Sequence, residues 1–212
     1  MAIVDFPPVE KADEHGLLAL GGDLELDSLL LAYSRGIFPW PISEEYPLAW
    51  FSPNPRGILF YDKLHLSKSF RKFLRNNPYE IKFNSNFESV ILNCARVKRL
   101  HQESTWITDD IVTAYIDLYR AGFAYSVEAY REEHLVGGLY GVCINNFFSG
   151  ESMFHTEDNA SKVALVSLMY TLHQREIGWI DTQMVTPVVK ALGGIEIERE
   201  IYLKMLSKSL GQ

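Results

Sequence analysis

Three polar side chains lie in apolar or strand-like stretches, and their types suit the handling of protons. Glu151 stands in FFSGESMFH at 147–155, where desolvation penalises a charge that has no partner. Asp181 and Gln183 stand in WIDTQ at 179–183, and residues two apart on a strand project from the same face. A carboxylate beside a carboxamide can orient a reacting group or take its proton. A buried polar pair that ties down neighbouring backbone explains Asp181 and Gln183 about equally well.

The surroundings of Glu151 decide between a ligand contact and an ordinary exposed glutamate. Strand alternation places Ser149 and Glu151 on one face and Phe148 on the other, unless Gly150 introduces a bulge. Gly150 also allows a ligand or another backbone to approach closely. A glutamate exposed on a half-solvated strand is the usual explanation, and the flanking glycine and aromatic residues make that explanation less favourable here.

A basic segment provides a second candidate site. SKSFRKFLRNN at 67–77 has no acidic residue, and Ser67 is placed to cap a helix that ends near Arg75. Helical spacing puts four cations on one face: Lys68, Arg71, Lys72 and Arg75. The whole chain has a net charge of −7, so it is an acidic molecule with one basic region. A solvated face explains such a helix about as often as a phosphate-binding one.

Two tryptophans lie in irregular, proline-rich chain, which is an unusual place for core residues. They are Trp40 and Trp50, in the segment 36–56. Such rings can stack on nucleic-acid bases, or they can join a small domain to a large one. Both roles are compatible with the sequence.

The composition is that of an ordinary globular protein and excludes several classes. The chain has 212 residues, 47% of them hydrophobic and 22% charged, which predicts one or two domains. The two cysteines and six histidines show no ligand spacing, so no metal, cofactor or disulfide framework is expected. The first residues lack the pattern of a signal peptide, and no apolar run approaches the roughly 20 residues that span a bilayer. A cytoplasmic protein is predicted.

The elements change character near residue 56, which predicts a small N-terminal domain at 1–56 and a larger domain at 57–212. In the first part, one helix is expected between Asp27, as its cap, and Gly36, as its stop. The prolines that follow forbid a long regular element. In the second part, Thr108 caps a helix that runs to about residue 121.

The order of elements in the second part predicts the fold class. Three strand-like runs at 123–154, joined by short turns, predict an antiparallel meander. A long helix from about 159, the strand WIDTQ, a short helix and an alternating run at 195–200 follow. This order predicts an α+β fold, with helices packed on a mostly antiparallel sheet.

The chain resembles the leucyl/phenylalanyl-tRNA–protein transferases along nearly its whole length. The motifs that carry the resemblance are GLLALGGDL at 16–24, LLLAYSRGIFPW at 29–40, SPNPR at 52–56, TWIT at 105–108, LVGGLYGV at 135–142, GESMF at 150–154, ASK at 160–162 and IDTQ at 180–183. The resemblance implies a small N-terminal domain and an acetyltransferase-like (GNAT-related) C-terminal domain. It also implies transfer of Leu or Phe from aminoacyl-tRNA to an N-terminal Arg or Lys, which marks the acceptor protein for degradation by the N-end rule.

The resemblance implies a role for each candidate residue. Asp181 and Gln183 would position and help deprotonate the attacking α-amine, and Glu151 would meet the cationic end of the acceptor. The aminoacyl pocket would be formed by Leu139, Phe148, Leu168, Leu172 and Ile180. The 3′ adenosine would contact Trp40, Trp106 and Tyr115, and the basic helix would hold the acceptor stem of the tRNA. Because Phe148 and Glu151 alternate, the pocket and the acceptor contact are expected on different sides of their strand.

Two other functions are compatible with parts of the sequence. An acyl-CoA N-acetyltransferase of the GNAT type needs a glycine-rich loop for pyrophosphate, and DNASK at 158–162 is not one. An RNA-binding adaptor without catalysis accounts for the basic helix and the tryptophans. It leaves Glu151, Asp181 and Gln183 unexplained.

Overall fold

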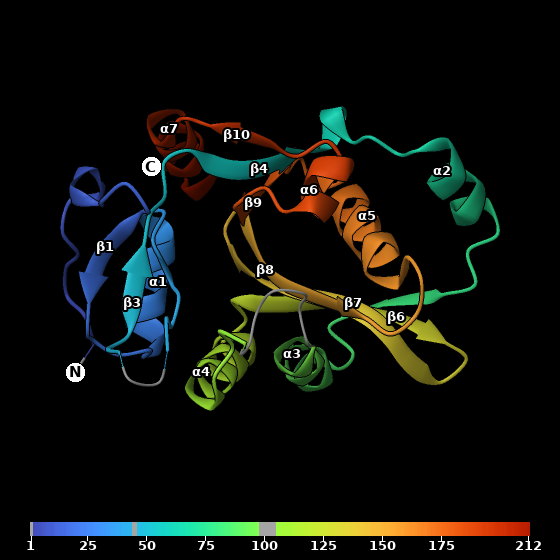
Figure 1. Cartoon of the computed structure of the whole chain (residues 1–212), viewed down its shortest axis with the longest axis horizontal. Coiled ribbons are helices and arrows are strands. Elements are labelled where there is room, and N and C mark those ends of the chain that lie inside the picture. Colours follow the sequence, from blue (N-terminus) through green and yellow to red (C-terminus); the bar gives the residue numbers. More distant parts are fainter. Residues whose placement is uncertain (1, 44–45, 98–104) are drawn as a thin grey trace.

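A seven-stranded sheet forms the centre of the molecule (Figure 1). The computed structural model of the chain describes residues 2–43, 46–97 and 105–212. Within these described ranges, the strands follow the order β10-β4-β9-β8-β7-β6-β5, and only β8 and β9 pair in parallel. Their bounds are β4 (Arg56–Phe60), β5 (Glu80–Phe83), β6 (Ala124–Arg131), β7 (His134–Ile144), β8 (Phe147–His155), β9 (Trp179–Gln183) and β10 (Ile195–Ile197). The predicted meander is confirmed as β6, β7 and β8.

A second, three-stranded sheet lies in the N-terminal part, at one end of the molecule (Figure 1). Its antiparallel strands are β1 (Leu17–Leu20), β3 (Ala49–Phe51) and β2 (Phe38–Pro39), in that order. A 3-10 turn, η1 (Val9–Lys11), and helix α1 (Leu26–Ser34) complete this part. The strands at 36–56 are only two or three residues long, as the prolines require. The domain boundary at residue 56 stays a prediction, and Arg56 itself already belongs to the large sheet.

Helices cover both faces of the large sheet. Their bounds are α2 (Lys68–Arg75), α3 (Phe87–Arg96), α4 (Asp109–Arg120), α5 (Ala160–His173), α6 (Pro187–Ala191) and α7 (Arg199–Leu210), with a 3-10 turn η2 (Tyr61–Lys63). One hydrophobic cluster joins α3 and α4 to the sheet and to α1 and α7, and a second cluster joins α5 to the opposite face. The predicted α+β class is therefore confirmed. Among the described residues, no helix is both long and apolar enough to cross a membrane.

Local capping explains where several helices begin and end. Ser67 and Thr108 accept hydrogen bonds from the backbone N–H three residues on, as predicted. Gly36 ends α1 with a φ of 73°, a left-handed conformation that glycine adopts without strain. The expected cap at Asp27 is wrong, because α1 begins at Leu26 and Asp27 lies inside its first turn. A carboxylate there still interacts favourably with the helix dipole.

Candidate active site

A cavity of about 630 Å³ opens between β8 and β9, next to the point where the two strands pair. Their only paired position is Ser149 opposite Asp181. The wall of the cavity combines an apolar side, a pair of indole rings and several polar side chains, and it includes Leu139, Leu168, Ile180, Trp40, Trp106, Glu151 and Gln183. Three of the predicted pocket residues and two of the three predicted polar residues thus line one cavity.

Strand β8 has a β-bulge at Glu151. Tyr140 of β7 pairs with Ser152, and the next residue, Gly141, pairs with Gly150, so Glu151 is the extra residue in β8. Glu151 accepts hydrogen bonds from Ser149 and Tyr115, whereas Phe148 belongs to the cluster under α5, so the two side chains lie on opposite faces of β8 as strand alternation predicts. The cavity nevertheless includes both Glu151 and the apolar pocket residues. The strand therefore does not keep the pocket and the expected acceptor contact apart.

Glu151 and Gln183 are in direct contact across the two strands. The Gln183 Nε2 donates to Glu151 Oε1 at 2.9 Å and to Ser149 Oγ at 3.0 Å. The Ser149 hydroxyl in turn donates to Glu151 Oε1 at 3.0 Å. Since both amide hydrogens of Gln183 are used, its carbonyl oxygen is the group it can offer to a substrate.

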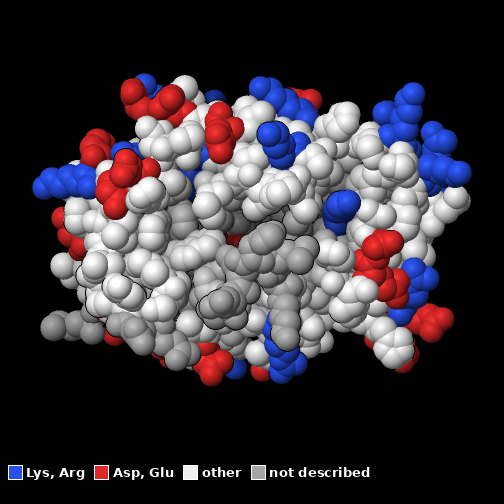
Figure 2. All heavy atoms as spheres, in the orientation of Figure 1, with Lys and Arg blue, Asp and Glu red and all other residues white. Residues whose placement is uncertain are grey.

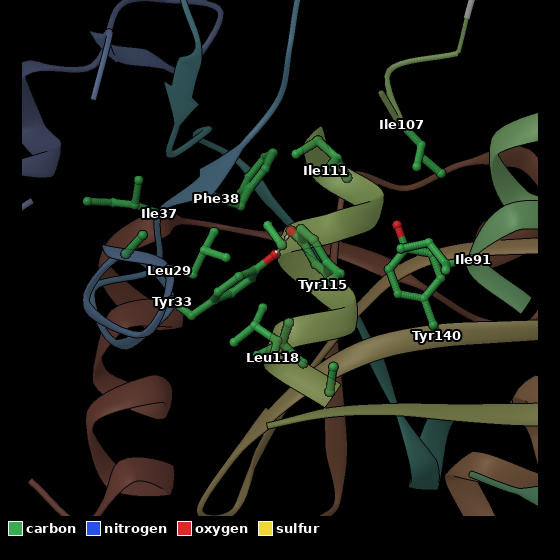
Figure 3. Close-up of a cluster of buried hydrophobic side chains, with 14 of the residues drawn as sticks. Leu29, Tyr33, Ile37, Phe38, Ile91, Ile107, Ile111, Tyr115, Leu118 and Tyr140 are labelled. Carbon is green, nitrogen blue, oxygen red and sulfur yellow. Dashed lines mark hydrogen bonds between the residues drawn. The ribbon is translucent and has the colours of Figure 1, made fainter. Parts of the chain in front are cut away.

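Two buried tyrosines hold the other side of the Glu151 carboxyl. The Tyr115 hydroxyl donates to Glu151 Oε2 at 3.4 Å and forms a short hydrogen bond with Tyr33 (Figure 3). Figure 3 shows the two hydroxyl groups meeting between α1 and α4. Burial, with the Glu151 charge adding to it, raises the pKa of Tyr33 and of Tyr115 well above the ordinary value. Both hydroxyls therefore stay protonated at neutral pH.

The environment of Glu151 makes its carboxyl titrate near neutrality. Burial raises the pKa of Glu151 to about 7, against the opposing effect of hydrogen bonds from Tyr33 and Ser149. The charge of Asp181 adds to this rise and that of Arg56 opposes it. A carboxyl with such a pKa can both accept and return a proton at physiological pH.

Asp181 lies behind the cavity wall instead of on it. Its side chain is fully buried, and Arg56 donates to it from Nε at 2.9 Å and from Nη2 at 2.6 Å. The Tyr202 hydroxyl and the Gln183 backbone N–H each donate to it at 2.9 Å. The sequence prediction that Asp181 and Gln183 lie together holds, but their side chains occupy different surroundings.

Some residues of the predicted aminoacyl pocket line the cavity, and the others lie behind its wall. Leu139, Leu168 and Ile180 line the cavity. Phe148 and Leu172 belong to the same hydrophobic cluster but do not line it. The sequence missed other apolar lining residues, namely Met153, Leu165, Met184, Val188 and Val189. Met153 in β8 and Leu165 in α5 have the spacing of ordinary core residues, so no signal in the sequence distinguished them from the core.

The predicted adenosine contacts divide in a similar way. Trp40 and Trp106 stack with ring centroids 5.0 Å apart at 18°, and both line the cavity. Tyr115 has no exposed surface and reaches the cavity only through its hydroxyl, by way of Glu151. Trp50 is buried in the N-terminal part against Phe6, so it takes the core role.

The basic helix α2 lies at the far end of the molecule from the N-terminal sheet (Figure 1). Figure 2 shows blue side chains gathered over that end. A shallow depression of about 320 Å³ is lined by all four predicted cations, Lys68, Arg71, Lys72 and Arg75. Phe70 anchors the helix to the cluster under α5, so the charged face is left outward.

Fold and cavity together define an α+β protein with an apolar ligand site that ends at a titratable carboxyl. Sequence comparison gives the family. The profile described as leucyl/phenylalanyl-tRNA protein transferase matches residues 58–207, and that of the N-terminal domain of the same transferase matches residues 22–54. The chain belongs to the leucyl/phenylalanyl-tRNA–protein transferase family.

Relatives of this name match the chain over most of its length. The transferase of Flavobacterium johnsoniae is 45% identical over 95% of this chain and 94% of its own. That of Dechloromonas aromatica is 49% identical over 95% of this chain and 87% of its own. Among solved structures, a GCN5-related N-acetyltransferase from Kribbella flavida aligns with 79% of this chain and 59% of its own, at 8% identity and a TM-score of 0.38. This likeness is too weak to add to the topology described above.

Proposed function

We propose that the protein moves Leu or Phe from aminoacyl-tRNA to the α-amino group of a protein that begins with Arg or Lys. Membership of the family supports this activity. The observation that carries it for this chain is that Glu151 lines the same cavity as the apolar wall and the stacked indoles. A donor amino acid and a cationic acceptor can therefore meet at one point. The acceptor would be marked for degradation by the N-end rule, in the cytoplasm.

The donor occupies the apolar and aromatic parts of the cavity. Its side chain lies against Leu139, Leu168 and Ile180, with Phe148 and Leu172 supporting that wall from behind. Its 3′ adenosine contacts Trp40 and Trp106, because every base has a face that stacks on an indole. Leu and Phe are unbranched at Cβ, so a pocket that is narrow at its mouth admits them in preference to Val and Ile.

The acceptor amine attacks the ester carbonyl carbon of the donor. An amide bond forms, the ester C–O bond breaks, and the 3′ oxygen of the tRNA leaves as a hydroxyl. Glu151 takes the proton that the amine loses and returns it to the leaving oxygen, while the Gln183 carbonyl orients the amine. Because the ester is already activated, orientation and proton transfer suffice, and no nucleophilic Ser or Cys is needed.

The body of the tRNA is held at a distance from the chemistry. The four cations of α2 neutralise phosphates of the acceptor stem, with little reading of sequence. Such binding weakens as salt rises, because each contact releases counterions. No cofactor or metal takes part in this scheme.

Transfer of labelled Leu and Phe from charged tRNA to a peptide that begins with Arg tests the proposal. An N-acetylated peptide of the same sequence is the matched control, since it lacks the attacking amine. Glu151→Ala should weaken use of the acceptor more than binding of aminoacyl-tRNA. Equal loss of both contradicts the role of Glu151, and turnover of acetyl-CoA in place of transfer supports the GNAT alternative.

A further inference from the structure

Arg56 is the most deeply buried cation among the described residues, and it lies directly behind the site. Its side chain is 1% exposed and is held between the rings of Phe38 and Tyr202, at 4.8 and 4.5 Å from their centroids. Its Nη1 donates to the Gly36 carbonyl at 3.0 Å, its Nε and Nη2 donate to Asp181, and Nη2 also donates to the Tyr202 hydroxyl at 3.3 Å. The guanidinium thus joins the end of α1 to strand β9.

Asp181 is held by its partners behind the wall of the cavity, whereas Glu151, which also accepts several hydrogen bonds, lines the cavity itself. Each carboxylate oxygen accepts two hydrogen bonds: Oδ1 from Arg56 Nε and Gln183 N–H, and Oδ2 from Arg56 Nη2 and the Tyr202 hydroxyl. A carboxylate offers about four lone-pair sites, and these donors fill them. Asp181 is also fully buried, so the α-amine cannot reach it.

The anchored Asp181 fixes the backbone of Gln183. Gln183 has a φ of 56°, a left-handed conformation that is unfavourable for a residue other than glycine. The 2.9 Å bond from its N–H to Asp181 Oδ1 helps to hold that conformation. In it, the carboxamide turns toward β8 and donates to Ser149 and Glu151. A continuous series of contacts therefore runs from Arg56 to the carboxyl that faces the cavity.

We propose that Arg56 is a positioning residue for aminoacyl transfer, which fixes Asp181 as a buried anchor so that Gln183 and Glu151 face the attacking amine. The inference rests on the proposed function. It assigns the proton transfer to Glu151 and removes Asp181 from it. Arg56 touches no substrate, and it acts only through the geometry of the two residues in front of it.

Arg56→Lys is the first test, because lysine keeps the charge but lacks the two-pronged guanidinium that fits both carboxylate oxygens. The measurement is the single-turnover transfer rate per bound aminoacyl-tRNA, with saturating acceptor. We expect the rate to fall roughly 10- to 100-fold, as for other displacements of catalytic groups, with unchanged stoichiometry and affinity for aminoacyl-tRNA. A purely structural role would lower the fraction of protein that binds donor and leave the rate per bound donor unchanged.

Arg35→Lys is the matched control, since Arg35 pairs with Asp5 at the surface and should leave the rate within about twofold of wild type. If Arg56→Lys does not bind donor, the double variant Arg56→Met, Asp181→Asn decides, because neutral partners avoid an unpaired buried charge. The inference is overturned if a variant that still binds the donor transfers at a rate within about twofold of wild type. It is also overturned if both variants lose donor binding. If the wild-type protein itself transfers no amino acid, the proposed function is refuted and not the role of Arg56.

Discussion

Glu151 has a carboxyl group whose pKa is raised to about 7, so both of its protonation states are populated at neutral pH. Desolvation is the main cause, and it acts against the hydrogen bonds that favour the charged form. The same burial that makes the group reactive disfavours the carboxylate in the folded protein. Activity and stability should therefore both depend on pH through this one residue, in opposite directions.

Transfer should become faster as pH rises through about 7, because the carboxylate form of Glu151 accepts the proton of the amine. Glu151→Gln removes that step and should slow transfer at pH 8 roughly 100-fold. The measurement is the single-turnover rate from pH 5.5 to 9. The pKa of the acceptor α-amine is about 8 with either protein, so the rate of the variant should still rise with pH around that value and should lose the rise near 7. An unchanged profile in Glu151→Gln would rule out the assignment of the base.

Folding stability should respond to pH with the opposite sign. Because the folded pKa of Glu151 lies above the unfolded value near 4.5, the folded state binds the extra proton between pH 4.5 and about 7. Its contribution to stability is present below this window and is lost as pH rises through it. Glu151→Gln should therefore gain about 1–3 kcal/mol relative to wild type between pH 5 and pH 8. Urea unfolding at the two pH values measures the gain, and a pH-independent difference would argue against a raised pKa.

Elements differ in how far the sequence predicts them. The helices at 68–75 and 109–120 begin at capping side chains, and the meander alternates over long runs, so local signals define them. Strand β4 and helix α7 gave no comparable signal: β4 is short and buried between two partners, and α7 follows an alternating run without a side-chain cap. These two elements carry Arg56 and Tyr202, which the sequence analysis did not propose.

Some features of the candidate site can be predicted from local sequence, and others depend on contacts between distant parts of the chain. Glu151, Asp181 and Gln183 are polar residues in apolar strands, and this contrast is visible in the sequence. The partners of Asp181 are not visible, because Arg56 lies 125 residues away along the chain and reaches it only through sheet pairing. The contact of Glu151 with Gln183 likewise depends on the parallel pairing of β8 with β9, which the spacing of the residues allows but does not require.

Helix α2 should account for a measurable share of tRNA affinity. Lys72→Glu with Arg75→Glu reverses two charges on its exposed face and should weaken tRNA binding at least about tenfold at low salt. The dependence of log Kd on log salt should also flatten, by roughly 0.7–0.9 for each phosphate that α2 no longer neutralises. Lys204→Glu with Lys208→Glu on the exposed side of α7 makes the same change in net charge. Equal effects of the two double variants would mean that only the total charge matters.

At the scale of the whole molecule, the two ends differ in charge and in packing. The chain has a net charge of −7, yet blue side chains gather at the α2 end in Figure 2, so long-range attraction should orient an incoming tRNA toward that end. At the other end, α7 packs against the N-terminal part. Tyr202 contributes to the same hydrophobic cluster as Tyr33 and Phe38. The N-terminal part is thereby joined to the strands that hold Asp181 and Gln183.

The contact between α1 and α7 should contribute to the free energy of unfolding of the whole molecule. Gly36 has a φ of 73°, and a Cβ there would lie 2.7 Å from the Tyr202 ring. Gly122 has a similar φ of 85°, but nothing lies within 4 Å of its Cβ position. Gly122→Ala should cost about 1 kcal/mol for the backbone alone, and Gly36→Ala roughly 1–3 kcal/mol more for the packing. Urea unfolding measures both, and equal losses would show that α1 and α7 do not stabilise each other.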